Sequence, residues 1–375
     1  MFWLNMKILF KKIISKAKTP IKKIATHLFP IDKNYRVLYF ISYLKSFPYK
    51  PVKSNDTKEY DLVFVIDQGN RGWILDAICK EIARYFSGNS HFSYSYYFPG
   101  ENVFSHSPNN LPLPPAKAYF FAHYSYFAVC LRLHPILWNR QSFIYYTHPK
   151  GIMTDDQFAY VMNQSTKVIC MCSQFAERLV HCGVNPEKVT YVLGAADPDM
   201  FPPHQRSGDG VIGFCTAYYP RKDPERILNI IKLLPHRKFI LIGKDWEKYE
   251  NFSELIALPN LSYVQVPYSE YPQYYAAMDV FVSPAKLEGG PIPLIESMMC
   301  NVVPVASKTG FAPDIITHGE NGLLFEIDSS SEEISELIEQ AFQIKSDIRK
   351  TVEHLSWKNF SLDIQKLIES SGTTI

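Results

Sequence analysis

The feature that most constrains the fold of this chain is a regular alternation of short apolar runs with helix-like segments. Several runs, such as Leu62–Ile66, are apolar at every position, which is the composition of a strand covered on both faces. Helix-like stretches lie between them, for example Trp73–Tyr85 and Gln174–His181. The alternation predicts an α/β protein with parallel sheets, built from β-α-β units with helices on both faces of each sheet.

The alternation pauses at residues 202–210, which are of turn or linker types. At 375 residues the chain has the length of about two domains of ~150 residues each. We therefore predict two facing Rossmann-like domains, at 60–201 and 211–350, with a basic extension at 1–59 and a helical segment at 351–375. Ligands of open α/β sheets bind beyond the carboxyl ends of the strands, so the chemistry is expected in loops that follow strands.

Six strands are predicted in each domain. They are Asp61–Asp67, Phe92–Phe98, Ala118–Ala122, Ser142–His148, Lys167–Ser173 and Lys188–Leu193 in the first domain, and Val211–Thr216, Lys238–Gly243, Leu261–Val266, Val280–Pro284, Val302–Ala306 and Gly322–Ile327 in the second. Later helices are predicted at Ser331–Ile344 and Trp357–Ile368.

Cysteine usage and hydropathy indicate the compartment. Seven cysteines are scattered without the spacing of metal ligands, and Cys170 and Cys172 alternate in an apolar run, so both are expected on one face of a strand. Buried, reduced thiols indicate a reducing cytoplasm. No apolar stretch reaches the ~20 residues of a transmembrane helix, and lysines interrupt the N-terminal apolar positions, so no secretory signal is expected. The net charge of +2 is uninformative about partners, but no long acidic or basic block lies outside the N-terminus, which argues against nucleic-acid binding.

The N-terminal 1–30 segment carries seven lysines and no acidic residue. Apolar side chains, among them Phe2, Trp3 and Phe10, recur at three- and four-residue steps, which is the period of a helix. A basic helix with aromatic residues on its apolar face can lie in an anionic membrane interface, which would place the protein peripherally at the inner face of the membrane. The alternative is a helix that docks on the body of the protein.

The most informative segment is 280–300, which contains a predicted strand, a loop with two glycines and a helix predicted to begin near Pro293. Glycines let the backbone approach a ligand, and the helix N-terminus offers N–H donors and a positive dipole end to a diphosphate. Two carboxylates, Glu288 in the loop and Glu296 on the helix, can accept hydrogen bonds from hydroxyl groups. A nucleotide sugar carries the groups that such a site would bind, namely a diphosphate, a ribose diol and sugar hydroxyls. The alternative is a solvated acidic loop with a glutamate that caps the helix.

The segment resembles the signature of glycosyltransferase family 4, in which two glutamates eight positions apart flank a glycine-rich loop. The resemblance continues through Val302–Gly310 and Asn321–Phe325 and covers residues 60–370 in order, more weakly in the first half. It implies a GT-B fold, with a nucleotide-sugar donor bound by the second domain and an acceptor by the first. It also implies a retaining reaction and a last helix that packs back on the first domain.

By the same resemblance, Glu288 contacts the donor sugar and Glu296 the ribose hydroxyls. The backbone of four residues would hold phosphate or sugar, namely Gly289, Gly290, Pro291 and Ile292. The chain departs from the family pattern at three places. Gly290-Pro291 stand where many family members have an aromatic residue followed by a glycine. Ala285 stands where a serine is frequent, and Thr309 where many members have the first glycine of the closing block.

Cationic side chains after the first strand of the second domain can neutralise a leaving diphosphate, which is usually the largest contribution in such catalysis. The family pattern has an arginine and, five residues later, a lysine. Lys222 matches the lysine, Ala217 occupies the arginine position, and Arg221 is expected to supply the missing charge. The alternative for Arg221 and Lys222 is a solvated turn.

In the first domain, His148 ends a predicted strand and matches a histidine that touches the donor sugar in the resembling enzymes. A departing phosphate can take the acceptor proton, so the reaction does not require a general base. We therefore assign His148 a positioning role, alongside Glu288 and Lys222. The alternative is a histidine in an ordinary turn without a role in binding. Gly69 and Gly72 lie in the loop after the first strand, which is the right place for a glycine loop that faces the diphosphate. The alternative is an ordinary turn between a strand and a helix. That loop is not G-x-G-x-x-G, which disfavours a nicotinamide site.

No metal ion or other cofactor is expected. Asp197-Pro-Asp199 has the D-x-D form of a metal motif, but it lies in a segment that resembles the block before the family's linker. The predicted partners are a nucleotide-sugar donor and a glycan or lipid-linked acceptor, as in the synthesis of surface polysaccharide or glycolipid. The alternatives are a nucleotide-sugar epimerase of similar fold and a non-catalytic partner subunit that has kept the fold.

Overall fold

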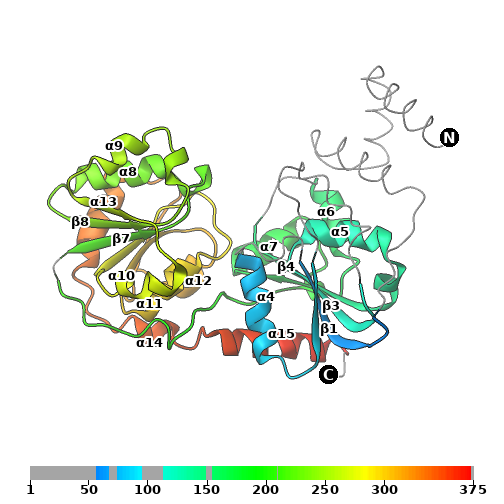
Figure 1. The fold of residues 1–375 in the computed structure, drawn as a ribbon. Helices are drawn as coiled ribbons and strands as arrows, with labels where there is room; N and C mark the ends of the chain where they lie inside the picture. Colours follow the sequence, from blue (N-terminus) through cyan, green and yellow to red (C-terminus); the bar gives the residue numbers. More distant parts are fainter. Residues whose placement is uncertain (1–55, 67–73, 95–112, 149–153, 209, 373–375) are drawn as a thin grey trace, which may run out of the picture.

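The computed structural model describes residues 56–66, 74–94, 113–148, 154–208 and 210–372. They form two α/β domains, connected by the segment near residue 205 and by the C-terminal helices (Figure 1). The predicted N-terminal helix at 1–30 and the loop of Gly69 and Gly72 lie outside the described residues. Within those residues, no helix has both the length and the apolar character needed to cross a membrane.

The first domain contains a six-stranded parallel sheet in the order β2-β1-β3-β4-β5-β6. Its strands are β1 (Tyr60–Ile66), β2 (Ser90–Tyr94), β3 (Ala116–Phe121), β4 (Gln141–Tyr146), β5 (Lys167–Cys170) and β6 (Val189–Tyr191). The helices are α4 (Ile74–Tyr85), α5 (Tyr124–Leu133), α6 (Asp155–Met162) and α7 (Ser173–His181), with 3-10 turns η2 (Pro135–Asn139) and η3 (Pro186–Lys188). The central strands are almost fully buried, as expected for apolar runs with helices on both faces.

The second domain contains a parallel sheet in the order β12-β11-β10-β7-β8-β9. Its strands are β7 (Val211–Cys215), β8 (Lys238–Ile242), β9 (Leu261–Val264), β10 (Val280–Ser283), β11 (Val303–Ser307) and β12 (Leu323–Phe325). The helices are α8 (Pro224–Leu233), α9 (Phe252–Ile256), α10 (Tyr271–Tyr275), α11 (Ile292–Met299), α12 (Ala312–Ile315), α13 (Ser331–Ala341) and α14 (Arg349–Val352), with turns η4 (Pro220–Lys222), η5 (Trp246–Lys248) and η6 (Tyr268–Glu270). The predicted class, two domains with doubly wound parallel sheets, is confirmed.

Local details differ from the prediction. Strand β5 ends at Cys170, so Cys172 does not share a strand face with it. Cys172 keeps extended backbone angles but is the residue that precedes α7, because a helix needs a non-helical residue at its start. Both thiols are buried, and none of the seven cysteines, all of which lie in the described residues, forms a disulfide. Helix α11 begins at Ile292, so Pro293 is its second residue rather than its first.

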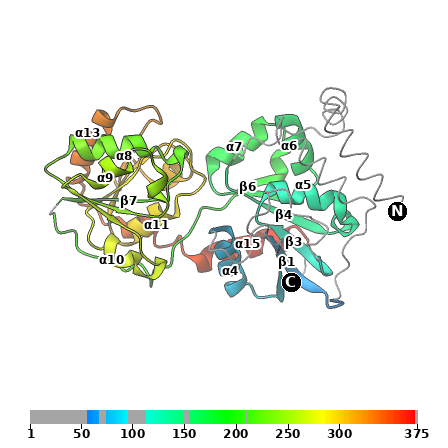
Figure 2. The same ribbon diagram turned by 45° about the horizontal axis from the view of Figure 1, so that its top comes forward.

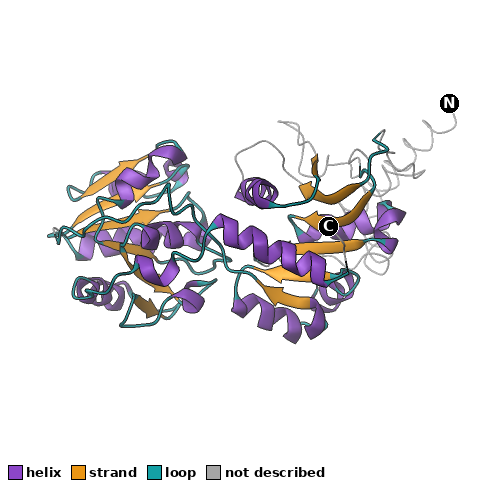
Figure 3. Ribbon diagram, turned by 90° about the horizontal axis from the view of Figure 1, so that it is seen from below, coloured by secondary structure: helices purple, strands orange, loops and turns teal. Residues whose placement is uncertain are grey.

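The last helix, α15 (Trp357–Ser370), runs from the second domain onto the first (Figure 3). It packs against α4, where the Ser361 hydroxyl donates to the carbonyl of Ile82 at 2.7 Å. The chain leaving the first domain runs beside the start of this helix. The Ala196 N–H donates to the carbonyl of Leu355 at 3.0 Å, and Ala196 forms a parallel bridge with Ser356. The two connections between the domains are therefore bonded to each other.

The domains also touch near the carboxyl ends of their strands, where α7 lies on the side of the first domain that faces the second (Figure 2). Asp314 of α12 accepts hydrogen bonds from the Ser173 backbone N–H at 3.0 Å and from the Ser173 hydroxyl at 2.5 Å. The residue before α7, Cys172, makes no side-chain cap. The N-terminus of a first-domain helix is thus capped by a carboxylate of the second domain.

Candidate active site

The glycine loop between β10 and α11 lies directly against the first domain. A Cβ built on Gly289 would lie 1.8 Å from the carbonyl oxygen of Thr147, which follows β4. A Cβ on Gly290 would lie 2.3 Å from the terminal methyl group of Met171. Neither position has room for a side chain, so the glycines allow the two domains to approach. The sequence predicted that these glycines approach a ligand, and the neighbour that the structure places there is the first domain.

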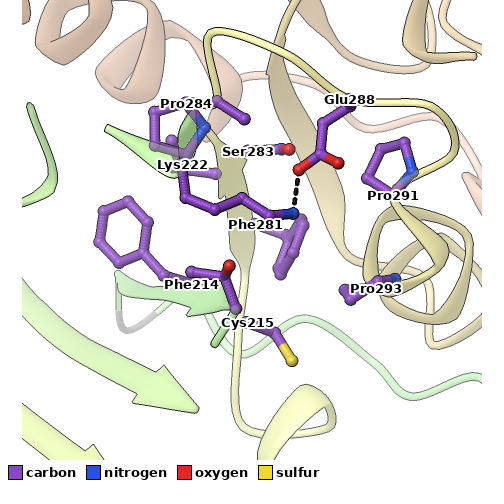
Figure 4. Close-up of a pocket in the computed structure, with 12 residues that line it drawn as sticks. Phe214, Cys215, Lys222, Phe281, Ser283, Pro284, Glu288, Pro291 and Pro293 are labelled. Atoms are coloured by element: carbon purple, nitrogen blue, oxygen red, sulfur yellow. Dashed lines mark hydrogen bonds and ion pairs between the residues drawn. The ribbon is translucent and has the colours of Figure 1, made fainter. Parts of the chain in front are cut away.

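Glu288, the residue before the glycines, is buried and holds two cations. Only 5% of its surface is exposed. Its carboxylate pairs with Lys222 through Oε1 and with Arg221 through Oε2 at 3.1 Å, and Figure 4 shows the Lys222 pair. The Glu288 backbone N–H donates to the Thr309 hydroxyl at 3.1 Å. The structure thus brings together three residues that the sequence assigned to one site, and it gives Thr309, which replaces a family glycine, a role as anchor.

A small cavity lies beside this ion pair (Figure 4). It is lined by Phe214, Cys215, Thr216, Lys222, Phe281, Val282, Ser283, Pro284, Ala285, Glu288, Pro291 and Pro293. Its volume of about 20 Å³ is enough for roughly one water molecule. A diphosphate does not fit in a space of this size, and in this arrangement Glu288 competes with any anion for the two cations.

The turn that carries the two cations is held by an aspartate that the sequence analysis did not single out. Asp223 follows the turn Pro220–Lys222 with φ 55°, in the left-handed region that residues other than glycine adopt infrequently. Its buried carboxylate pairs with Lys286 of the glycine loop at 3.1 Å. The Lys286 backbone N–H in turn donates to the Arg221 carbonyl at 2.9 Å. The signal available in the sequence was Asp223 directly before Pro224, a combination typical of helix starts.

Glu296, predicted to bind the ribose, is completely enclosed. It is 1% exposed, and its two oxygens accept hydrogen bonds from Tyr268 at 2.5 Å and Tyr275 at 2.9 Å. Burial raises the pKa of Glu296 to about 7, although the two phenol hydrogen bonds oppose this shift. Neither tyrosine was predicted, because both come from the connection between β9 and β10, well away from the motif.

Replacing Glu296 with Gln is expected to stabilise the protein at pH 8 and much less at pH 5. An unfolded glutamate titrates near 4.5 and the folded one near 7, so between these values the folded state binds more protons and stability falls as pH rises. A shift of this size corresponds to about 3 kcal/mol, which the uncharged amide avoids. The free energy of unfolding in urea at both pH values measures the effect, with exposed Glu250→Gln as control. Equal changes at pH 5 and pH 8 would contradict it.

His148 lies at the boundary between the domains. It follows Thr147, whose carbonyl oxygen faces Gly289, so the end of β4 and the glycine loop are neighbours. The His148 Nδ1 lies 3.1 Å from the Thr147 hydroxyl oxygen. The positioning role of His148 toward a donor stays a prediction, as do the ligand roles of Glu288 and Lys222.

The D-x-D segment forms a turn in the structure. The Asp197 carboxylate accepts hydrogen bonds from the backbone N–H groups of Asp199 at 2.9 Å and Met200 at 3.2 Å. In the described part of the chain, no group of three or more His, Cys, Asp and Glu side chains is arranged to hold a metal ion. A reaction without metal stays a prediction.

Comparison with known proteins gives a consistent assignment. Residues 197–355 match the family of glycosyl transferases group 1. An uncharacterized glycosyltransferase of Methanocaldococcus jannaschii is 25% identical over 229 residues, which cover 56% of this chain and 62%, less than two thirds, of that protein. The crystal structure of Anabaena Alr3699/HepE in complex with UDP has a TM-score of 0.67 at 14% identity, covering 83% of this chain and 100% of that one.

The lipopolysaccharide outer core galactosyltransferase WaaB, in its apo form, is similar to the same extent. Its TM-score is 0.64 at 12% identity, over 84% of this chain and 99% of that one. Structural similarity at such low identity establishes the fold. The chain therefore has the two-domain GT-B fold of these glycosyltransferases, and its second domain is similar in sequence to the group 1 family.

Proposed function

We propose that the protein is a glycosyltransferase that moves a sugar from a nucleoside-diphosphate sugar to a glycan or lipid-linked acceptor. The observation that carries this proposal is the cluster before α11, where Lys222 and Arg221 meet the buried Glu288 beside two glycines. Two cations and a helix N-terminus suit a diphosphate, and a carboxylate suits sugar hydroxyls. The group 1 match of this domain and the UDP complex of the Anabaena protein support it.

In this proposal each charged residue has one task. Lys222 and Arg221 neutralise the diphosphate as it leaves, when its negative charge is greatest. Glu288 accepts hydrogen bonds from the transferred sugar, and Glu296 accepts them from the ribose. The backbone of residues 289–292 lies next to the phosphates at the start of α11. Because Lys222 and Arg221 supply the positive charge, no metal ion is assigned.

We further assign the retaining mechanism of glycosyltransferase family 4. The bond between the sugar and the diphosphate oxygen breaks, and the acceptor oxygen forms the new bond on the same face of the sugar. The departing phosphate oxygen takes the proton of the acceptor hydroxyl, so no protein base is needed. His148 then orients the donor sugar from the first domain. An acceptor in surface polysaccharide or glycolipid synthesis agrees with the outer core galactosyltransferase of similar fold.

Calorimetric titration with UDP, GDP and ADP, followed by assays with the corresponding nucleotide sugars, tests the function. We expect at least one diphosphate to bind, and we expect its nucleotide sugar to release the same diphosphate in the presence of acceptor glycans. An epimerase would convert the sugar without releasing the diphosphate. A non-catalytic subunit would bind the donor without turnover. Either result would refute the proposal.

We also propose that residues 1–30 attach the enzyme to the inner face of the membrane. Seven lysines and no acidic residue give this segment a strong attraction to anionic lipid. Deleting residues 1–30 is expected to abolish co-sedimentation with phosphatidylglycerol vesicles while donor hydrolysis persists. Vesicles of phosphatidylcholine alone serve as the control. Co-sedimentation that survives the deletion, or that high salt does not weaken, would contradict this role.

A further inference from the structure

The carboxylate of Glu296 is covered by two phenols that differ in their exposure to solvent. Tyr275, on α10, is fully buried, whereas Tyr268 is 48% exposed and belongs to the short turn η6 after Pro267. The Tyr268 ring contacts its neighbours only edge-on, with centroids 6.0 Å from Phe201 and 5.3 Å from Tyr271. Tyr268 is therefore the partner of Glu296 that can leave without opening the core.

Glu296 is connected to the cavity beside the cation pair through Tyr275 and Cys215. Cys215, at the end of β7, lines the small cavity that Lys222 and Glu288 also line (Figure 4). The Cys215 thiol also forms a hydrogen bond with Tyr275, which in turn binds Glu296. Contacts through Tyr275 and Cys215 thus link Glu296, on α11, to the cavity that Glu288 lines.

An enclosed carboxylate cannot accept a hydrogen bond from a ligand while both phenols remain. Glu296 is 1% exposed, so a ligand hydroxyl reaches Oε1 only where the Tyr268 hydroxyl now lies. Exchanging one hydroxyl donor for another keeps the buried carboxylate satisfied throughout, which avoids the penalty for an unpaired buried acceptor. A ribose diol is chemically equivalent to the phenol in this exchange, because both donate O–H to a carboxylate oxygen.

We propose that Tyr268 is a gate on Glu296, whose hydroxyl occupies the place of the donor's ribose and leaves when the nucleotide binds. This inference rests on the proposed function and adds a positioning residue to it. The gate lowers apparent nucleotide affinity, because binding must first break the bond between Tyr268 and Glu296. It also makes ribose recognition an exchange rather than a simple gain of a hydrogen bond.

The test is the variant Tyr268→Phe, which keeps the ring and its contacts and removes only the hydroxyl. Calorimetry with UDP, GDP or ADP, whichever binds the wild type, is expected to give a Kd about five- to tenfold lower for Tyr268→Phe, since one hydrogen bond no longer has to be broken. The 2′,3′-dideoxy form of the same diphosphate is expected to show no such gain. Tyr271→Phe, which removes the hydroxyl of a neighbouring ring that does not bind Glu296, is expected to match the wild type.

The outcomes separate the gate from the function. An unchanged or higher Kd for Tyr268→Phe would overturn the gate and show that Tyr268 stays in place or binds the nucleotide itself. An equal gain for the dideoxy nucleotide would overturn it too, because the ribose hydroxyls would then not be what replaces the phenol. Failure of wild type and variant alike to bind any of the three diphosphates would instead refute the proposed function, and the gate with it.

Discussion

Replacing Lys222 with Ala is expected to lower the turnover of sugar transfer by about 100- to 1000-fold, the usual cost of removing one charge-stabilising donor from a transition state. Donor affinity should fall much less. The diphosphate becomes more negative as the bond to the sugar breaks, so Lys222 contributes more to the transition state than to the ground state. Arg221 remains to pair with Glu288, which keeps the buried carboxylate compensated and the domain folded.

Steady-state transfer and calorimetric donor binding, compared in one buffer, separate these two effects. The matched control is Lys232→Ala on α8, which removes a lysine from an exposed pair with Glu254 and is expected to change neither quantity appreciably. Wild-type turnover in Lys222→Ala would refute the assignment of the diphosphate site. A loss confined to donor affinity would show that Lys222 binds the ground state and the transition state equally.

Replacing Glu288 with Gln is expected to lower transfer at least about 100-fold and, in the same variant, to strengthen binding of the free diphosphate about tenfold. The two effects have different causes. In the wild type, Glu288 is paired with Lys222 and Arg221, so we expect a diphosphate to compete with Glu288 for these two cations. The amide holds the cations weakly and releases them to the diphosphate, but it no longer offers a charged acceptor beside the reacting sugar.

Calorimetry with the free diphosphate and with the intact nucleotide sugar distinguishes the two roles of Glu288. The nucleotide sugar is expected to gain less affinity than the diphosphate, because it loses the contact between Glu288 and the sugar. Glu254→Gln, at an exposed ion pair, is the control. An unchanged affinity for the diphosphate would mean that the ion pairs do not compete with the ligand. Full activity together with an unchanged affinity would remove Glu288 from the site.

The fold was predictable because its signals are local. The apolar run of β1 has to be covered on both faces, and the turn-rich residues 202–210 separate two such series of strands. Glu288 and Lys222 were predictable as members of one site for a related reason. Each follows a strand, and the carboxyl ends of parallel strands in one sheet lie at the same edge.

The contacts that complete the site were not predictable, because they pair residues that no local pattern connects. Tyr268 binds Glu296 from 28 positions away, and Thr309 binds the backbone of Glu288 from 21 positions away. Which of the many tyrosines faces a buried carboxylate depends on the path of the chain between β9 and β10. The glycines show the same limit, since the motif indicated a close approach but not that Thr147 of the other domain makes it.

The paired connections between the domains have a mechanical consequence. A single tether would let one domain swivel freely, whereas two segments bonded at Ala196 and Leu355 confine rotation mainly to a line through both. Moving the domains apart about that line would lift Gly289 from the first domain and withdraw Asp314 from Ser173. The Ser173 N–H at the start of α7 would then lose its carboxylate acceptor, so the protection of that helix end depends on the angle between the domains.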